Sequence, residues 1–365
     1  MRGENGAGNL LQESEPPLIG STDLFPHISV QYTDTKGYIT SSLYKDRKVT
    51  MAVVPTNNTE RVKLNTGAEI PIVGLGTWQA TGNDGNDCYE AVLAALRAGY
   101  RHIDTAAIYG NEDQVGRAIR DSGIPREEIF LTTKLWCTQH REAAAALDQS
   151  LERLGTDYVD LYLMHWPVAL KTRFITDGKI LSFPTREDGL RDVDVKDWNF
   201  IKTWHLMQEL LASGKVKAIG ISNFTEARIN ELLSAPGTTV VPAVNQVENH
   251  PLLPQHSLVK FCKAKGIAIE CYSPLGSSDA PVLKEPAIVK IADKLGIQPA
   301  QVVISWQVQR GNIVLPKSVH ESRIQANLKT VVLPDEDFEA LNNLSKQSGE
   351  RRIISGEFFA PFKPF

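Results

Sequence analysis

Beyond residue 60, hydrophobic and polar positions follow two patterns that take turns along the chain. Amphipathic segments with helical spacing each end at a glycine, and a short run rich in β-branched and aromatic residues follows. These glycines are Gly99, Gly155, Gly214, Gly266 and Gly311. Each stands where the end of a helix commonly needs a left-handed residue. The runs behind them are apolar on both faces, which is typical of strands in a buried parallel sheet.

The pattern predicts eight strands with helices between them. We expect the strands at roughly 72–77, 100–105, 129–135, 158–165, 218–223, 242–248, 268–273 and 313–317. Such alternation indicates an α/β protein, and eight parallel strands indicate a closed (β/α)8 TIM barrel. Ahead of the first strand, a β-hairpin that turns at Asn65-Thr66-Gly67 is expected to cap the barrel.

An open doubly wound sheet is the alternative fold. Gly74 and Gly76 could open the G-x-G-x-x-G fingerprint of a dinucleotide-binding fold, but Gln79 stands where the third glycine is required. No helical pattern begins directly behind this segment either. We therefore interpret these glycines as the tight end of a strand.

Two segments depart from the regular spacing. Between the fourth and fifth strands an irregular stretch at about 167–197 lengthens the connection, and long loops at this end of a barrel are usually functional. Residues 1–60 show neither pattern and are rich in Gly, Ser, Thr, Asn and Pro. We expect them to form a disordered extension or leader, with Met51 as a candidate initiator, ahead of a barrel over 61–365.

Composition and charge narrow the classes of function. A net charge of −4 leaves no basic excess for a phosphate backbone, so nucleic acid is not an expected partner. No apolar run approaches the ~20 residues of a membrane span, so no membrane association is expected. The four cysteines form no CxxC pair, which favours a reducing compartment, the cytoplasm, over secretion.

In a barrel of this kind, catalytic groups stand at the carboxyl ends of the strands. The polar and aromatic residues at these ends are Asp104, Tyr109, Lys134, Trp136, His165, Trp166, Ser222, Asn223, Gln246, Glu248, Asn249, His250, Tyr272, Ser273, Lys317 and Ser318. Taken singly, an Asp here often caps a helix, a Lys is solvated and a His forms a structural hydrogen bond. Together, Asp, Tyr, Lys and His at neighbouring strand ends can transfer a proton.

The chemistry follows from the ionisation of tyrosine. A free tyrosine has a pKa of about 10, and a neighbouring lysine ammonium is expected to lower it. Asp104 would hold Lys134 charged, a neutral His165 would orient a carbonyl oxygen, and Tyr109 would be the general acid that protonates this oxygen. No metal is expected, since the sequence contains no HExxH pair and no Cys/His spacing of a zinc site.

These strand ends resemble those of the aldo-keto reductases over residues ~61–355. The matching segments are GLGTW, YRHIDTAAIYGNE, LTTKLW, DLYLMHWP, GISNF, NQVENHP, YSPLGS and LPKS…RIQAN, in this order. Three further segments, LWCTQH, FPTREDG and WNFIKTWHLMQEL, are similar to the fungal branch that contains NADP-dependent glycerol dehydrogenases and short-chain aldehyde reductases.

The resemblance implies a set of functional residues. The catalytic tetrad would be Asp104, Tyr109, Lys134 and His165, with Tyr109 as the proton donor. In NADPH, the nicotinamide carboxamide would contact Ser222, Asn223 and Gln246, and the nicotinamide ring would stack on Tyr272. The pyrophosphate would be covered by Ser273, Leu275 and Ser277, with Asp279 closing this loop. The 2′-phosphate would contact Lys317, Ser318 and Arg323, and the adenine would contact Asn327. Trp78, Trp136 and Trp166, with His165, would line the substrate cleft.

The chain departs from the family pattern in two places. Ala326 stands where many relatives carry a glutamate beside the adenine-contacting asparagine. The C-terminal segment, GERRIISGEFFAPFKPF, has no motif that we can match to the family, and the segment at this place normally helps to set substrate preference.

Elementary electrostatics favours NADP over NAD independently of the resemblance. A 2′-phosphate needs cationic and hydroxyl partners, and Lys317, Ser318 and Arg323 supply them near the expected start of a helix. The alternative for these three residues is an ordinary capped and charged surface helix.

Two functions from different classes remain in view. The first is a monomeric, NADPH-dependent reductase of aldehydes and ketones, such as glyceraldehyde or other short-chain or sugar-derived carbonyls, which would oxidise glycerol in reverse. The second is an NADPH-binding regulatory subunit with the same barrel and little turnover. The intact tetrad favours the enzyme.

Overall fold

The computed structural model describes residues 31–33, 39–41, 53–80, 86–175, 177–277 and 279–365. Two short strands, β1 (Gln31–Thr33) and β2 (Ile39–Ser41), pair with each other antiparallel. Most of the expected extension over 1–60, Met51 included, lies outside the described residues. Its disorder therefore stays a prediction.

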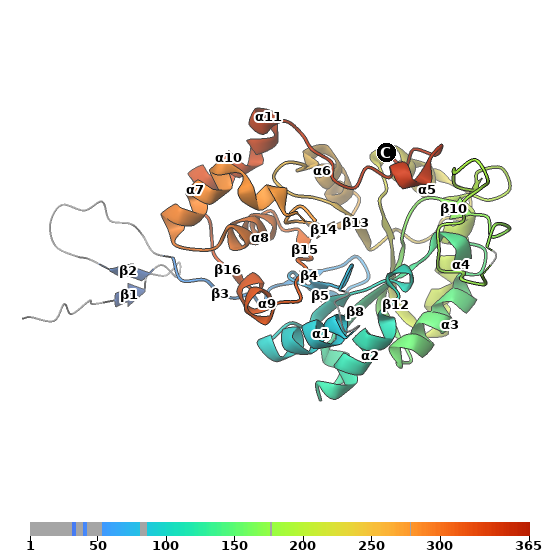
Figure 1. Cartoon of the computed structure of the whole chain (residues 1–365), viewed down its shortest axis with the longest axis horizontal. Helices are drawn as coiled ribbons and strands as arrows, with labels where there is room; N and C mark the ends of the chain where they lie inside the picture. Colours follow the sequence, from blue (N-terminus) through green and yellow to red (C-terminus); the bar gives the residue numbers. More distant parts are fainter. Residues whose placement is uncertain (1–30, 34–38, 42–52, 81–85, 176, 278) are drawn as a thin grey trace, which may run out of the picture.

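The core of the fold is a sheet of eight parallel strands that closes on itself. Figure 1 shows helices around it. In spatial order the strands are β6 (Leu75–Gly76), β7 (His102–Asp104), β8 (Phe130–Leu135), β9 (Val159–Met164), β12 (Val216–Ser222), β13 (Val244–Glu248), β14 (Ala268–Tyr272) and β15 (Ile313–Val314). A parallel bridge between Val73 and Val314 joins the first strand to the last, and the Val314 amide donates to the Ile72 carbonyl oxygen at 2.8 Å. The predicted barrel is confirmed, and an open sheet is excluded.

The helices lie on the outside of this barrel. They are α1 (Asp87–Ala98), α2 (Glu112–Asp121), α3 (Ala143–Leu154), α4 (Phe200–Leu210), α5 (Glu226–Ser234), α6 (His256–Ala264), α7 (Pro286–Leu295), α8 (Pro299–Gln309), α9 (Glu321–Asn327), α10 (Asp335–Asn342) and α11 (Leu344–Ser348). All five glycines expected behind helices have positive φ, from 62° at Gly155 to 110° at Gly99, as the sequence pattern predicts. Among the described helices, none is long and apolar enough to cross a membrane.

A β-hairpin covers the amino end of the barrel. Its strands, β4 (Arg61–Lys63) and β5 (Glu69–Pro71), pair antiparallel, and the turn includes Gly67 at a φ of 86°. Leu64 and Ile70 are buried among apolar residues near the starts of barrel strands, which include Phe130, Leu161, Val244 and Ile313. Because the hairpin covers this end, the catalytic residues are expected at the opposite, carboxyl end of the barrel.

The packed protein begins before residue 61. β3 (Thr56–Asn57) pairs antiparallel with β16 (Lys329–Thr330), and Val53 is buried among apolar residues of α7 and α8. These residues fall within the extension predicted over 1–60, because a two-residue strand has no recognisable sequence period.

Two irregular segments meet at the carboxyl end of the barrel. The predicted insertion forms β10 (Ala169–Leu170) and β11 (Val193–Asp194), which pair antiparallel. The C-terminal segment, drawn in red in Figure 1, ends near β10 and α5. Phe183 of the insertion and Phe359 of the C-terminal segment share one apolar cluster with Trp136 and Trp166, which follow barrel strands. Both segments therefore border the barrel mouth.

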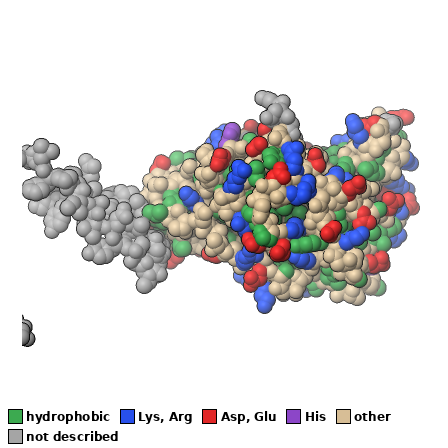
Figure 2. Space-filling view, turned by 90° about the horizontal axis from the view of Figure 1, so that it is seen from below, with side chains coloured by type: hydrophobic (Ala, Val, Ile, Leu, Met, Phe, Trp, Pro, Cys, Tyr) green, Lys and Arg blue, Asp and Glu red, His purple; other side chains and the backbone are tan. Residues whose placement is uncertain are grey.

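The described surface carries charges of both signs. On the face shown in Figure 2, acidic and basic side chains lie among one another, with no continuous basic area among the described residues. This distribution agrees with the net charge of −4.

Candidate active site

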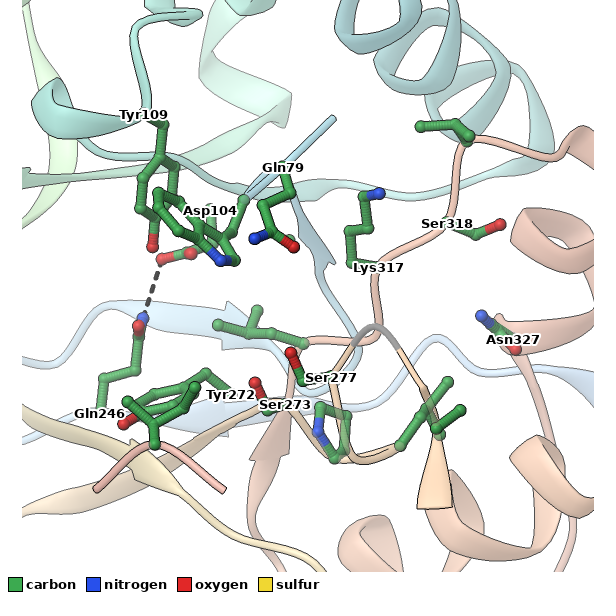
Figure 3. A pocket seen from close by; sticks show the side chains of 18 of the residues that line it. Gln79, Asp104, Tyr109, Gln246, Tyr272, Ser273, Ser277, Lys317, Ser318 and Asn327 are labelled. Carbon is green, nitrogen blue, oxygen red and sulfur yellow. Dashed lines mark hydrogen bonds between the residues drawn. The ribbon is translucent and has the colours of Figure 1, made fainter. Parts of the chain in front are cut away.

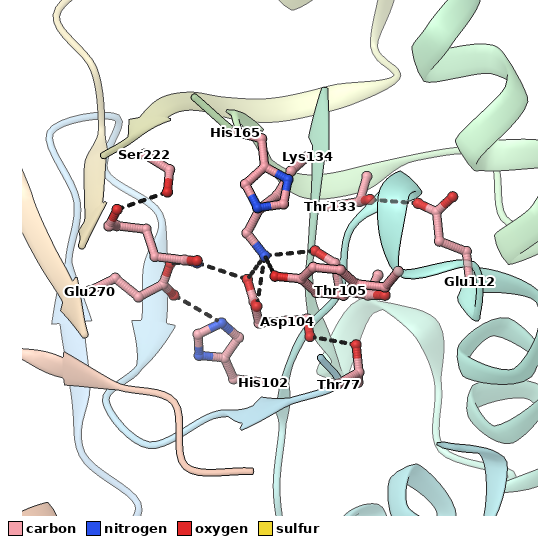
Figure 4. Close-up of polar contacts among 12 residues, drawn as sticks. Thr77, His102, Asp104, Thr105, Glu112, Thr133, Lys134, His165, Ser222 and Glu270 are labelled. Carbon is pink, nitrogen blue, oxygen red and sulfur yellow. Dashed lines mark hydrogen bonds and ion pairs between the residues drawn. The ribbon is translucent and has the colours of Figure 1, made fainter. Parts of the chain in front are cut away.

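A buried ion pair connects the carboxyl ends of β7 and β8 (Figure 4). The Nζ atom of Lys134 donates to both carboxylate oxygens of Asp104, at 2.8 and 2.7 Å, and to the Thr105 carbonyl oxygen at 2.8 Å. Burial alone would lower the pKa of Lys134, but Asp104, with smaller contributions from Tyr109 and Glu270, outweighs burial and raises it. Lys134 therefore keeps its charge inside the barrel.

Tyr109 reaches this ion pair from a 3-10 turn directly behind β7, η1 (Ala107–Tyr109). Its hydroxyl oxygen lies 3.3 Å from Nζ of Lys134. Burial raises the pKa of Tyr109, and Lys134 offsets that rise only in part. The expectation that Lys134 gives Tyr109 a lowered pKa is thus wrong for the net shift, because burial and the Asp104 charge outweigh the ammonium. The phenol keeps its proton at neutral pH, as a proton donor must.

The ring of His165 completes the predicted tetrad. Its centroid lies 5.7 Å from that of Tyr109 and 5.4 Å from that of Trp136. Burial, with the positive charge of Lys134 adding to it, lowers the pKa of His165 well below its usual value. Its Nδ1 atom is buried without a hydrogen-bond partner among the described residues. A neutral ring with its proton on Nε2 is therefore favoured, and it can donate into the cavity.

A second layer of polar side chains lies below the tetrad, inside the barrel. Nε2 of Gln246 donates to Oδ1 of Asp104 at 2.8 Å and to Oε2 of Glu270 at 2.6 Å. The other carboxylate oxygen of Glu270 lies 3.3 Å from Nε2 of His102, and both of these side chains are fully buried. Because Gln246 uses its amide hydrogens in this way, its amide oxygen is left for the cavity that it lines.

Glu270 and His102 are not among the functional residues predicted from the sequence. Both stand in apolar strand segments that we expected to be buried on both faces, and an ionisable side chain in such a place needs a partner. That conflict between residue type and position was the signal that could have found them.

Three residues of the tetrad, Asp104, Tyr109 and His165, line a cavity of about 960 Å³ (Figure 3). In Figure 3, Tyr109 and Asp104 are on one side of the view, and Lys317, Ser318 and Asn327 are on the other. The cavity is therefore elongated, with proton-transfer groups and cationic groups at different ends.

Three of the predicted cofactor residues are connected beside the tetrad. The Tyr272 hydroxyl donates to Oδ1 of Asn223 at 2.8 Å, and Nδ2 of Asn223 donates to the His165 carbonyl oxygen at 2.9 Å. The Ser222 hydroxyl donates to the Gln246 carbonyl oxygen at 2.8 Å. All three side chains line the cavity.

The loop behind β14 forms one wall of the cavity. Ser273, Leu275 and Ser277 line it, as the sequence analysis expects of residues that cover a cofactor. Ser273 and Ser277 have φ of 47° and 62°, a left-handed conformation that serines rarely adopt. Asp279 is exposed and is not among the lining residues, so its closing role stays a prediction.

The far end of the cavity is cationic. Lys317, Ser318, Arg323 and Asn327 all line it. α9 begins at Glu321, so Arg323 lies in its first turn, close to the helix start that the sequence analysis expects. Lys317 and Arg323 are exposed, and the Ser318 hydroxyl accepts the His320 N–H at 3.0 Å. Two cations and a hydroxyl thus line the same cavity.

The end near the tetrad is aromatic. Trp78, Trp136 and Trp166 line it, as predicted for the substrate cleft. The structure adds Ile108, Phe183, Ile354 and Phe358, which the sequence analysis did not name. Phe183 lies in the irregular insertion, and Ile354 and Phe358 lie in the segment that could not be aligned, so no repeating pattern pointed to them.

The family of the chain follows from a comparison with known families. The model of the Aldo/keto reductase family matches residues 72–346. The chain therefore belongs to the aldo/keto reductase family, and it is an oxidoreductase of that family.

Individual relatives are more specific. The chain is 61% identical over 309 residues to the glycerol 2-dehydrogenase (NADP(+)) of Saccharomyces cerevisiae, with 85% of this chain and 98% of that protein covered. It is 60% identical over 298 residues to the aldehyde reductase YPR1 of the same yeast, with 82% and 95% covered. Among solved structures, the aldose reductase of Schistosoma japonicum matches with a TM-score of 0.75 and 34% identity, over 84% of this chain and 98% of that one.

Proposed function

We propose that the chain is an NADPH-dependent reductase of aldehydes and ketones, and that in the reverse direction it oxidises polyols such as glycerol. The observation that carries this proposal is the Tyr109 hydroxyl, 3.3 Å from the Lys134 ammonium at the end of a large cavity. A protonated phenol beside a fixed positive charge is a general acid. The names of the two yeast relatives support the same chemistry.

The cavity residues fit an elongated dinucleotide with an anionic end. The amide oxygen of Gln246 and the side chains of Ser222 and Asn223 would hold the carboxamide, with Tyr272 against the nicotinamide ring. Ser273, Leu275 and Ser277 would cover the pyrophosphate, while Lys317, Ser318 and Arg323 would bind the 2′-phosphate and Asn327 the adenine. A phosphate beside two cations and a helix start is a favourable arrangement. When bound, NADPH supplies the hydride.

The protein itself handles the proton. Tyr109 donates its hydroxyl proton to the carbonyl oxygen as negative charge develops there, and the Lys134 ammonium stabilises the phenolate left behind. Asp104 holds Lys134 in place through two short hydrogen bonds. Neutral His165 orients the carbonyl oxygen from Nε2. In the oxidation of an alcohol, the Tyr109 phenolate accepts the hydroxyl proton.

The substrate class proposed is glyceraldehyde and other short-chain or sugar-derived carbonyls. The regulatory alternative has no support, since the two yeast relatives carry the names of enzymes. All four cysteines are unpaired and buried, which supports the proposal that the protein works in the cytoplasm. We also propose that it acts as a monomer, since the groups that would transfer the proton, Asp104, Tyr109 and Lys134, contact one another within a single chain.

The decisive experiment measures the loss of NADPH absorbance with glyceraldehyde and with a panel of further carbonyls, and the reverse reaction with glycerol and NADP⁺. Turnover in the wild type that is lost in Tyr109→Phe is the expected result. NADPH binding without turnover across the whole panel would contradict the proposal and favour the regulatory reading.

A further inference from the structure

A buried carboxylate outside the tetrad holds the C-terminal segment to the barrel. Glu248 is the last residue of β13, and its side chain is fully buried. Its Oε1 accepts the backbone N–H of Ile353 at 2.7 Å, and its Oε2 accepts that of Ile354 at 2.8 Å. Nε2 of His250 lies 3.0 Å from Oε1. The carboxylate therefore binds consecutive backbone groups from a segment more than a hundred residues away in the sequence.

The charge of Glu248 suits this contact. Burial would raise the pKa of Glu248, but the hydrogen bonds from His250 and from the two backbone N–H groups outweigh burial and hold the pKa below its usual value. The carboxylate is therefore ionised at neutral pH. Hydrogen bonds from backbone N–H groups to an ionised carboxylate are stronger than those to a neutral acceptor.

The segment held in this way forms part of the cavity wall. Ile354, whose N–H binds Glu248, lines the cavity, and so does Phe358 four residues further on. The ring of Phe358 lies 5.2 Å from that of Trp166 and 5.6 Å from that of Phe183, measured between centroids. These apolar side chains lie at the aromatic end, where a substituent on the carbonyl carbon must extend.

A second contact attaches the same wall from the other side. Nε of Arg191, in the insertion, donates to the Phe358 carbonyl oxygen at 2.8 Å, and the Arg191 amide donates to the Ala360 carbonyl oxygen at 3.1 Å. Glu248 and Arg191 thus hold the two ends of the stretch 353–360.

We propose that Glu248 is a positioning residue that determines substrate specificity, because it holds Ile354 and Phe358 against the aromatic end of the cavity. The inference rests on the proposed function. Carbonyls with a large apolar substituent reach these two side chains and depend on Glu248. Short aldehydes are bound beside the tetrad and do not.

The test compares an aldehyde of each kind, naphthaldehyde and propanal, in Glu248→Gln and Glu248→Ala. The KM for naphthaldehyde is expected to rise about tenfold in Glu248→Ala, the scale of one lost charge-assisted hydrogen bond. Glu248→Gln keeps one acceptor oxygen and should lie between the wild type and Glu248→Ala. The kcat with naphthaldehyde and both constants for propanal should change by less than about twofold, since the tetrad is untouched.

A matched control is Glu285, which holds the same segment through Arg351. Oε1 of Glu285 lies 3.2 Å from Nη1 of Arg351, and the Glu285 side chain is 10% exposed while that of Arg351 is 54% exposed. Because water reaches the Arg351 side of this ion pair, the pair contributes less than a fully buried one. Glu285→Gln makes the same chemical change as Glu248→Gln, and it should leave the KM and kcat of both aldehydes unchanged.

Hydrogen exchange supplies a readout that does not depend on turnover. The amides of Ile353 and Ile354 should exchange faster in both Glu248 variants, while those of β13 keep their protection. The proposal would be overturned by unchanged exchange of these amides, by an unchanged KM for naphthaldehyde, or by an equal loss of kcat/KM for both aldehydes. If Glu248→Ala does not fold, Glu248→Gln carries the test. Wild-type protein that reduces neither aldehyde would instead contradict the proposed function.

Discussion

Nζ of Lys134 lies 3.3 Å from the hydroxyl oxygen of Tyr109. The same nitrogen is bound to Asp104, so its charge is fixed in place before any substrate arrives. The proton donor thus has a stabilising cation ready for the phenolate that it becomes.

Tyr109→Phe tests this relationship directly. The substitution keeps the ring and its contact with Trp78, whose centroid is 4.9 Å away, but removes the transferable proton. General acid catalysis contributes roughly 10²–10⁴ in rate, so kcat should fall by about that factor. The dissociation constant of NADPH should hardly change. Near-normal turnover in the variant would remove Tyr109 from its role.

The expected dependence of kcat on pH follows from opposite shifts in the pKa values of Tyr109 and His165. Reduction needs protonated Tyr109, whose pKa is raised above the usual value of 10.0, and neutral His165, whose pKa is lowered well below 6.5. Both required forms are populated between these values. We therefore expect kcat for reduction to be flat from about pH 7 to about pH 9.5 and to fall only as Tyr109 loses its proton.

The reverse reaction provides the control for this profile. Oxidation of glycerol needs the Tyr109 phenolate, so its rate should rise with pH over the range in which reduction is constant. Steady-state rates in both directions, measured in buffers of constant ionic strength, give the two profiles. A limb near pH 6.5 in the reduction profile would mean that His165 is protonated more readily than its buried position implies.

The barrel could be predicted from the sequence because its signal is repeated. Each helix with its terminal glycine and each apolar strand repeats the same information, so one ambiguous element does not change the predicted fold. The tetrad was found for a related reason, since strand ends of a barrel converge whatever the sequence between them. The cavity wall formed by Ile354 and Phe358 has no such repetition. Its position depends on contacts between residues far apart in the sequence, such as those of Glu248 and Arg191, which no local pattern reveals.

Glu270→Ala tests the layer below the tetrad. Glu270 accepts one of the two hydrogen bonds from Nε2 of Gln246, and without it only the hydrogen bond to Asp104 orients the amide. We expect NADPH and NADH to bind more weakly by the same factor, about threefold to tenfold, which corresponds to one net hydrogen bond. Glu270→Gln keeps an acceptor oxygen for Gln246 and should bind both cofactors almost as the wild type does. Fluorescence titration with each cofactor measures these constants. A loss confined to NADPH would show that Gln246 and Glu270 do not act at the nicotinamide end.

Arg323→Ala tests the other end of the cavity. NADPH and NADH differ only by the 2′-phosphate, so a residue that binds this group should separate them and leave hydride transfer unchanged. Hydrogen bonds to charged groups contribute roughly 1.5–3 kcal/mol each, which is about one to two powers of ten in binding. NADPH affinity should fall by that factor in Arg323→Ala, while NADH affinity should hardly change.

The dependence of cofactor affinity on salt concentration gives a second test of Arg323. Arg323 is exposed, so its attraction for a phosphate is screened by added ions. The NADPH affinity of the wild type should therefore fall more steeply with salt than that of Arg323→Ala, and the NADH affinities should be nearly parallel. Dissociation constants for both cofactors at two salt concentrations, from the quenching of tryptophan fluorescence, give all the comparisons. An equal loss of affinity for NADPH and NADH would mean that Arg323 supports the fold of α9 and does not bind the phosphate. If neither affinity changes, the 2′-phosphate is bound elsewhere in the cavity, and the preference for NADPH loses its main physical support.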